Sequence, residues 1–273
     1  MDTWRLLITP PARGAWNMAV DEALLEAVGR AESLPTLRLY DWAPACLSLG
    51  YAQSYRDVDL HRLKANGWDV VRRATGGRAI LHVDELTYSV TAPPDEPRVQ
   101  GSVLESYQRL AGALVAAVRA LGLPVEIEQH AQPATNASAE KGPVCFEVPS
   151  AYEIVVGGKK LIGSAQARKR QGVLQHGTLP LHGDLARITQ ALVFTDEAAR
   201  ETAAQKLLAR ATTVESVTGQ GMAWETAAQA FARAFESQLG LKFERGELSS
   251  GEKAHAEELV QKKYGHPDWT ERH

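Results

Sequence analysis

The sequence predicts an α+β (α/β) fold in which a mixed or antiparallel sheet is flanked by helices. Strand-like and helix-like segments alternate over the first two-thirds of the 273 residues, and the last third is mostly helical. Short β-rich runs joined by glycine turns favour antiparallel pairing, because only antiparallel neighbours can share a tight turn. We expect one domain over residues 1–273, with a core at about 30–245 and a helical tail at 246–273.

Two helices are predicted in the first half of the chain. Trp16 to Ala31 carries apolar residues at helical spacing beside acidic ones. A second helix begins after Ser102, which forms a Ser-x-x-Glu capping box with Glu105. Gly122 and Pro124 end this helix.

Short β-rich runs predict the strands between and after these helices. They are Leu37–Asp41, Cys46–Tyr51, Asp69–Arg73, Ala79–Leu81 and Leu86–Thr91. A hairpin is expected from Ala151–Val156 and Lys160–Ala165 around a Gly157-Gly158-Lys159 turn. Residues 126–143 lack periodicity and predict a long loop, a feature that is often functional.

The remaining apolar patterns predict the helical last third. Four helices are expected, at Leu185–Val193, Asp196–Leu208, Trp224–Leu239 and Glu252–Tyr264, the last ending before Gly265 and Pro267.

Composition narrows the class of protein. A chain that is 44% hydrophobic and 23% charged is typical of soluble globular proteins, and a net charge of −3 excludes a generally basic nucleic-acid binder. The N-terminus has an early acid and a short apolar run before two prolines, so we expect no signal peptide. Two cysteines argue against a disulfide framework and favour a reduced, cytoplasmic protein. No apolar run approaches the roughly 20 residues that a membrane span needs, so none is expected.

Residues 72–82, R-R-A-T-G-G-R-A-I-L-H, are the first candidate for a binding site. Gly76 and Gly77 let the backbone approach a ligand and leave its N–H groups exposed. Arginines flank them and His82 follows, which indicates a charged or polarised ligand.

Cys145 is the candidate nucleophile. A lone cysteine is more often a small buried hydrophobe, as Cys46 in its alternating run is expected to be. Cys145 instead lies between prolines where a loop meets a strand, and the hairpin after it carries Lys159 and Lys160. A nearby ammonium stabilises the thiolate and makes such a cysteine nucleophilic at neutral pH.

The hairpin strand that opens with Lys160 is expected to line a cavity. Gly163, Ser164 and Ala165 follow closely, and small side chains let a ligand reach the backbone. The alternative is that Lys160 is only a solvated charge. His82 and His176 are each, taken alone, more often structural than catalytic. The absence of short ligand spacings such as C-x-x-C predicts no metal.

Basic residues in the two glycine-rich regions predict either a basic rim around a pocket or dispersed solvent charges, and both interpretations remain open. A rim would attract an acidic partner or a phosphate. The residues are Arg72, Arg73, Arg78, Lys159, Lys160, Arg168, Lys169 and Arg170. No Walker or G-x-G-x-x-G loop is present, so no ATP or dinucleotide cradle is expected.

Several blocks together resemble the lipoate and octanoate protein ligases and transferases, which share a catalytic fold with biotin protein ligase. The blocks are N-M-A-V-D-E-A-L-L at 17–25, L-S-L-G-Y-A-Q at 47–53, the 72–82 segment, K-L-I-G-S-A-Q at 160–166 and L-Q-H-G-T-L at 174–179. They run in the family's order over most of the chain. The resemblance implies a sheet like that of class II aminoacyl-tRNA synthetases.

Within that family the chain is most similar to octanoyl-acyl-carrier-protein:protein N-octanoyltransferases of the LipM type. The marks are G-G-R at 76–78, E-L-T-Y-S-V at 85–90, C-F-x-x-P-S-x-Y-E at 145–153 and K-Y-G-x-x-x-W at 263–269. The resemblance implies an acyltransferase of lipoate biosynthesis that moves octanoyl from octanoyl-acyl carrier protein to a lysine of an apo lipoyl domain such as glycine cleavage H protein. Neither nucleic acid nor membrane is implied as a partner, and no cofactor is expected.

The resemblance also assigns residues. Cys145 would form the acyl-thioester, and Lys160 would lower its pKa and position the acyl carbonyl. The implied substrate-binding residues are Arg72, Gly76, Gly77, His82, Gly163, Ser164, Ala165, His176 and Gly177.

One departure and three competing hypotheses accompany this interpretation. Relatives often follow the first-block histidine with an acid, whereas here Val83 precedes Asp84, which leaves the role of Asp84 open. An ATP-dependent lipoate ligase, with Lys160 contacting an acyl-adenylate, would need an accessory domain, and the roughly thirty residues after Leu241 are too few for one. A lipoyl or octanoyl amidotransferase would share the cysteine chemistry, and a non-enzymatic acyl-binding module would keep the pocket without the transfer.

Overall fold

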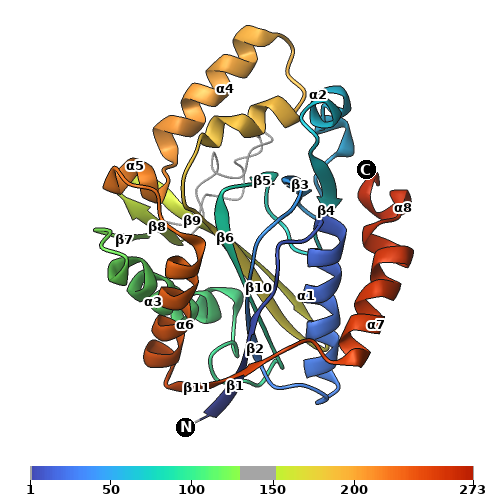
Figure 1. Cartoon of the computed structure of the whole chain (residues 1–273), viewed down its shortest axis with the longest axis vertical. Helices are drawn as coiled ribbons and strands as arrows, with labels where there is room; N and C mark the ends of the chain where they lie inside the picture. Colours follow the sequence, from blue (N-terminus) through green and yellow to red (C-terminus); the bar gives the residue numbers. More distant parts are fainter. Residues whose placement is uncertain (1, 130–151, 273) are drawn as a thin grey trace.

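A computed structural model describes residues 2–129 and 152–272 and contains the predicted mixed sheet at its centre (Figure 1). Eight strands run in the order β11-β1-β2-β6-β10-β9-β8-β7; β1 is parallel to β2 and β11, and the other neighbours are antiparallel. Their bounds are β1 Asp2–Ile8, β2 Thr36–Tyr40, β6 Glu85–Ala92, β7 Glu126–Gln129, β8 Tyr152–Val156, β9 Lys159–Lys169, β10 Gly172–Pro180 and β11 Leu241–Gly246. The predicted fold class is confirmed.

A second sheet of three strands lies beside the first and carries the glycine-rich segment. Its order is β4-β3-β5, with β3 at Cys46–Leu49, β4 at Asp69–Arg72 and β5 at Ile80–His82. The buried thiol of Cys46 lies inside this sheet, as its alternating sequence predicts.

Helices cover both faces of the large sheet (Figure 1). Helices α3 (Val103–Ala120) and α6 (Trp224–Leu239) pack on one face, and α1 (Gly14–Gly29) packs on the other, backed by α7 (Ser250–Leu259). Smaller helices complete the fold: η1 Tyr55–Asp57, α2 Leu60–Ala65, η3 Leu185–Ala191, α4 Glu197–Arg210, α5 Val214–Thr218, η4 Val260–Tyr264 and α8 Pro267–Thr270.

Apolar and polar side chains alternate along β6, so one face of the large sheet is apolar and the other is polar. Leu86, Tyr88 and Val90 point into the apolar core under α3 and α6. The residues between them, Thr87 and Ser89, hydrogen-bond to groups on the α1 side of the sheet. Because successive side chains of a strand point to opposite faces, one face becomes the core and the other is available for a polar site.

The predicted helices are confirmed with small shifts of their ends, and α3 has the expected capping box between Ser102 and Glu105. The expected helix at Leu185–Val193 is the 3-10 helix η3. The prediction of a loop over residues 126–143 is wrong at its start, because β7 extends the sheet beside β8; residues 130–143 lie outside the described chain. Strands β1, β10 and β11 were not predicted.

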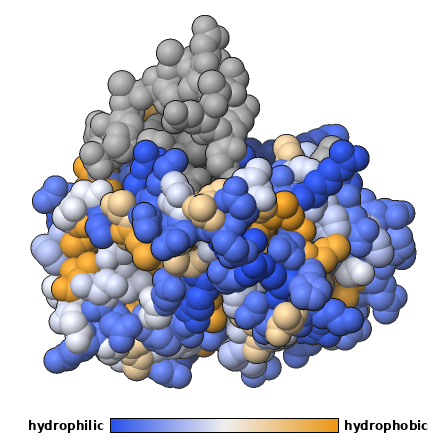
Figure 2. Space-filling view, turned by 90° about the horizontal axis from the view of Figure 1, so that it is seen from above, coloured by the Kyte–Doolittle hydropathy of each residue, from blue (hydrophilic) through white to orange (hydrophobic). Residues whose placement is uncertain are grey.

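None of the helices within residues 2–129 and 152–272 combines the length and apolarity needed to cross a membrane. The face seen from above is largely hydrophilic, with small hydrophobic patches scattered over it (Figure 2).

The C-terminal segment is fastened to the glycine-rich region by Arg72. This guanidinium is fully buried and donates to the carbonyl oxygens of Gly50 and Gln53 at 2.9 and 2.6 Å. It also donates to the carbonyl of Thr270 at 3.0 Å, and the indole N–H of Trp269 donates back to the Arg72 carbonyl at 2.8 Å. Arg72 therefore joins the end of the chain to the second sheet.

Replacing Arg72 with leucine is expected to lower the free energy of unfolding by roughly 3 kcal/mol, because several buried carbonyl groups lose their donor at once. Urea denaturation followed by circular dichroism measures this. The matched change Arg56→Leu, at an exposed arginine, should leave the midpoint unchanged. Equal midpoints for the two variants would show that Arg72 does not anchor the segment.

Candidate active site

A buried carboxylate, Asp21, organises the polar side of the sheet. Its Oδ1 accepts hydrogen bonds from Arg38 Nη1 and from the Ser89 hydroxyl, both at 2.8 Å. Its Oδ2 accepts from the Tyr40 hydroxyl at 3.0 Å and lies 3.3 Å from His176 Nδ1. Asp21 is 1% exposed and Arg38 is fully buried, so this is a desolvated ion pair that four structural elements share.

The electrostatics of this network define its protonation. Burial raises the pKa of Asp21, but the hydrogen bond with His176 and the charge of Arg38 outweigh it, so that pKa lies below its usual value. Burial lowers the pKa of His176, and the nearby Asp21 carboxylate does not fully offset this. At neutral pH the site therefore contains an ionised Asp21 and a neutral His176. The His176 Nδ1–H then faces Asp21, and its Nε2 accepts from the Thr75 hydroxyl at 2.6 Å.

The second histidine, His82, is held on three sides. Its Nδ1 lies 2.6 Å from a Glu85 carboxylate oxygen and its Nε2 lies 2.7 Å from the Ser48 hydroxyl. The ring stacks on the indole of Trp42 with centroids 3.9 Å apart. Glu85 also accepts from the Thr87 hydroxyl at 2.6 Å. The imidazole is thus fixed in one orientation as part of a wall.

Both histidines line one pocket between α1 and the two sheets, which spans about 430 Å³ when the open solvent in it is included. We call it the acyl-side pocket, after the acyl chain that the family resemblance implies. Of the predicted binding residues it contains Gly77, His82, Gly163, Ser164, Ala165, His176 and Gly177. Arg73 and Ile80, which belong to the predicted 72–82 segment, also line the pocket. The other lining residues, which were not singled out from the sequence, are Met18, Tyr40, Trp42, Thr87 and Thr178.

Because Gly177 has no side chain, strands β9 and β10 can approach each other closely behind this pocket. A methyl group there would lie 2.4 Å from the carbonyl oxygen of Gly163 and 2.8 Å from the Tyr88 ring. Both distances are far below van der Waals contact, so only glycine fits. Gly77 has φ +93°, which favours glycine as well.

Two predicted binding residues do not line the acyl-side pocket. Arg72 points away from it and bonds the C-terminal segment, and its neighbour Arg73 lines the pocket instead. Arg73 donates to the carbonyl of Ser48 at 2.9 Å and to that of Gly76 at 3.0 Å. Gly76 lies in the loop that Arg73 holds, and a side chain there would meet only open space.

The hypothesis of a continuous basic rim is wrong. Arg72 and Arg73 are buried, and β9 is 11 residues long, so its two ends lie roughly 30 Å apart. At the far end Lys169 pairs with Glu22 at 2.5 Å and Arg168 donates to the Val99 carbonyl. Lys169 and Arg168 therefore serve the packing of the fold, and Arg73 lines the pocket as a single buried cation rather than as part of a rim.

Lys160 lies at the start of β9, the strand that provides Gly163, Ser164 and Ala165 to the acyl-side pocket. It is 6% exposed, and its Nζ lies 2.8 Å from a Glu153 carboxylate oxygen, which excludes a solvated hairpin charge. Glu153 belongs to the C-F-x-x-P-S-x-Y-E block but was not singled out as a site residue. Cys145 of the same block lies outside the described residues.

Asp84 has a structural contact. It adopts φ +53° in the turn after β5, and its Oδ2 accepts from Arg187 Nη2 at 2.5 Å. Its backbone carbonyl accepts from Leu181 N–H at 2.9 Å. Asp84 therefore fixes the turn against the end of β10.

The fold and site define a class of protein. The chain belongs to the lipoyl protein ligase A/B catalytic domain family, whose model matches residues 13–236. Two solved structures share its fold. A bi-partite lipoate protein ligase of Thermoplasma acidophilum superposes with a TM-score of 0.80 at 26% identity, covering 99% of this chain and 97% of its own. A lipoate-protein ligase A bound with ATP gives 0.78 at 25% identity, with 99% coverage of both chains.

Curated relatives of similar length are named octanoyltransferases. Octanoyltransferase LipM of Kyrpidia tusciae is 40% identical over 274 residues, covering 100% of both chains. Octanoyltransferase LipM of Moorella thermoacetica is 42% identical over 281 residues, covering 99% of this chain and 98% of its own.

Gly177→Ala is expected to reduce both stability and activity, because the new methyl group separates β9 from β10 behind the acyl-side pocket. The matched change Gly112→Ala, in the middle of α3 with open space around it, should raise the free energy of unfolding by up to about 1 kcal/mol. Thermal denaturation and an activity assay compare the two. A Gly177→Ala protein as stable and active as wild type would contradict the close approach.

The low pKa of His176 gives stability a pH dependence. The folded pKa lies below the ordinary value of 6.5, so as pH falls below 6.5 the unfolded chain takes up a proton that the native state resists. The stabilisation is complete above pH 6.5 and is lost as pH falls through the folded pKa. In His176→Gln this contribution is missing, so the stability difference from wild type should shrink between pH 7 and about pH 5. Urea midpoints that stay equally far apart over this range would rule out a depressed pKa.

Proposed function

We propose that this protein transfers an octanoyl group from octanoyl-acyl carrier protein to a lysine of an apo lipoyl domain, in lipoate biosynthesis. Glycine cleavage H protein is the proposed acceptor. The observation that carries the proposal is the acyl-side pocket, whose walls combine apolar rings with the small residues Gly163–Ala165. Such a pocket suits an unbranched aliphatic chain, and the curated relatives are octanoyltransferases.

In the first step the Cys145 thiolate attacks the carbonyl carbon of the donor thioester. A carbon–sulfur bond forms to Cys145, the bond to the phosphopantetheine sulfur breaks, and the carrier leaves as a thiolate that takes up a proton. Backbone N–H groups near Gly76, Gly77 and Gly163–Ala165 are proposed to stabilise the oxyanion as it develops.

In the second step the neutral ε-amine of the acceptor lysine attacks the octanoyl-enzyme. A carbon–nitrogen bond forms, the Cys145 thiolate leaves, and the amine loses one proton. Thioester exchange is close to isoenergetic and amide formation from a thioester is downhill, so neither step needs ATP.

Lys160 is proposed to stabilise the Cys145 thiolate and to position the acyl carbonyl. Its ammonium is buried and has a carboxylate partner, Glu153, 2.8 Å away. Buried ammonium groups exert a strong field because little water screens them. The Glu153 contact fixes the direction of the Lys160 side chain at the start of β9.

An ATP-dependent lipoate ligase is the second candidate, because the fold also matches a lipoate-protein ligase A bound with ATP. The two candidates differ in their substrates. A ligase consumes ATP and free lipoate, whereas a transferase consumes an acyl thioester. An amidotransferase would take the acyl group from another lipoyl protein.

Wild-type protein mixed with octanoyl-acyl carrier protein and apo H protein should form the octanoyl-amide without ATP. Mass spectrometry should detect an octanoyl-enzyme that accumulates when the acceptor is omitted. Cys145→Ala should abolish both, and Cys46→Ala, at the buried cysteine of β3, is the matched control that keeps both.

Normal turnover by Cys145→Ala, with no acyl-enzyme, would refute the cysteine mechanism. Transfer that needs ATP and free lipoate would establish the ligase instead.

A further inference from the structure

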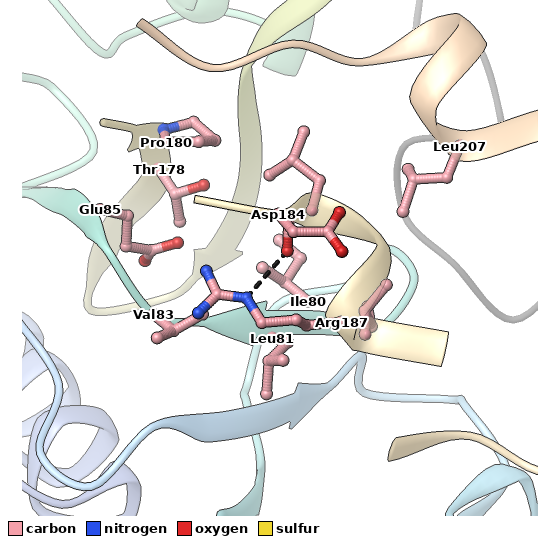
Figure 3. Close-up of a pocket in the computed structure, with 11 residues that line it drawn as sticks. Ile80, Leu81, Val83, Glu85, Thr178, Pro180, Asp184, Arg187 and Leu207 are labelled. Atoms are coloured by element: carbon pink, nitrogen blue, oxygen red, sulfur yellow. Dashed lines mark hydrogen bonds between the residues drawn. The ribbon is translucent and has the colours of Figure 1, made fainter. Parts of the chain in front are cut away.

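A second pocket adjoins the acyl-side pocket, and the reaction as described does not use it (Figure 3). We call it the η3 pocket, because η3 forms one wall. It spans about 440 Å³ when the open solvent in it is included, and its lining includes Val83, Leu185, Ile188 and Leu207. Ile80 and Thr178 line both pockets, which are therefore neighbours.

The two pockets follow one face of the large sheet. On that face the register of β10 and β6 pairs His176 with Ser89, Thr178 with Thr87 and Pro180 with Glu85. The first pair belongs to the Asp21 network, the second borders the acyl-side pocket and the third lines the η3 pocket. Four residues along a strand span about 13 Å, so the pockets form one elongated path.

The η3 pocket lies at the Lys160 end of this path. Leu207 forms the wall opposite Thr178 (Figure 3), and the turn after it returns to β9. There the N–H of Thr212 donates to the Lys160 carbonyl at 3.0 Å. The acyl-side pocket extends the other way, toward Trp42 and Tyr40. A thioester whose reacting carbonyl lies at the junction formed by Ile80 and Thr178 thus has space on both sides.

Thr178, at the junction, has an unsatisfied hydroxyl. The side chain is 2% exposed, and its oxygen has no hydrogen-bond partner among the described residues. A buried hydroxyl without a partner is costly, and a ligand carbonyl at the junction would satisfy it.

The η3 pocket is amphipathic. Its body is aliphatic, whereas Asp184 and Arg187 provide polar groups at the η3 wall, where Arg187 Nε donates to the Asp184 carbonyl at 2.9 Å (Figure 3). A ligand with alternating aliphatic and amide groups fits this lining better than a plain hydrocarbon chain.

We propose that the η3 pocket binds the pantetheine arm of the donor thioester while the acyl-side pocket holds the octanoyl chain. This assignment rests on the proposed function, because it requires a thioester donor. Pantetheine is a linear arm with two amides and a dimethyl-substituted carbon, and it continues directly from the thioester sulfur. Thr178 would donate to a carbonyl oxygen where the two halves of the donor meet.

The test compares two donors, octanoyl-pantetheine and octanoyl-N-acetylcysteamine, which lacks the outer part of the arm. Val83→Phe places a larger side chain in the η3 pocket, at a half-buried position of its lining. It should raise the KM for octanoyl-pantetheine by about tenfold and leave that for octanoyl-N-acetylcysteamine within about twofold. Val193→Phe, at a 51% exposed valine outside the pocket, should change neither value.

A binding measurement separates this proposal from the function itself. S-methylpantetheine cannot transfer an acyl group, and calorimetry should show that it binds wild type about tenfold more tightly than Val83→Phe. If it binds in this way but no thioester supports transfer, the proposed function fails and the pocket assignment stands.

Two results would overturn the assignment. One is that Val83→Phe, still folded by circular dichroism, raises the KM of both donors equally or of neither. The other is that ATP, but not S-methylpantetheine, binds in a manner sensitive to Val83→Phe, because the η3 pocket would then be a nucleotide site.

Discussion

The buried ion pair between Asp21 and Arg38 is the constraint on which the site depends. Two desolvated charges are tolerated only when every remaining hydrogen-bonding position is filled. Here Tyr40, Ser89 and His176 fill them, so α1, β2, β6 and β10 must meet at one point. This burial also sets the geometry of the site, because the same contacts orient the His176 ring and fix the floor of the acyl-side pocket.

The positions of the other pocket residues follow from the alternation of side chains along β6 and β10. Residues that alternate along β6 and β10 send apolar side chains under α3 and α6 and polar ones toward α1. Successive pairs on the polar face then become the Asp21 network, the border of the acyl-side pocket and the lining of the η3 pocket. Lys160 lies at the start of β9, beyond the residue that pairs with Thr178. In our proposal, this one face of the sheet holds the donor along its length.

Local motifs could be predicted from the sequence, and long-range partners could not. Gly163–Ala165 were recognisable as small residues in a predicted strand, whereas Gly177 was indicated only by the family resemblance. Asp21 and Glu85 were missed because their partners come from other elements of the sheet. Arg72 and Arg73 are adjacent in the chain, and the sequence does not show which of two consecutive side chains faces the pocket. In the structure, Arg73 lines the pocket and Arg72 does not.

The central claim is that the octanoyl chain lies on the Asp21 side of the sheet, with its carbonyl toward Lys160. A crystal structure with an octanoyl-pantetheine analogue, in which a methylene group replaces the thioester sulfur, measures this directly. The account predicts that the terminal methyl group lies within about 4 Å of the Trp42 or Tyr40 ring. An octanoyl chain in the η3 pocket, or on the sheet face under α3 and α6, would contradict it.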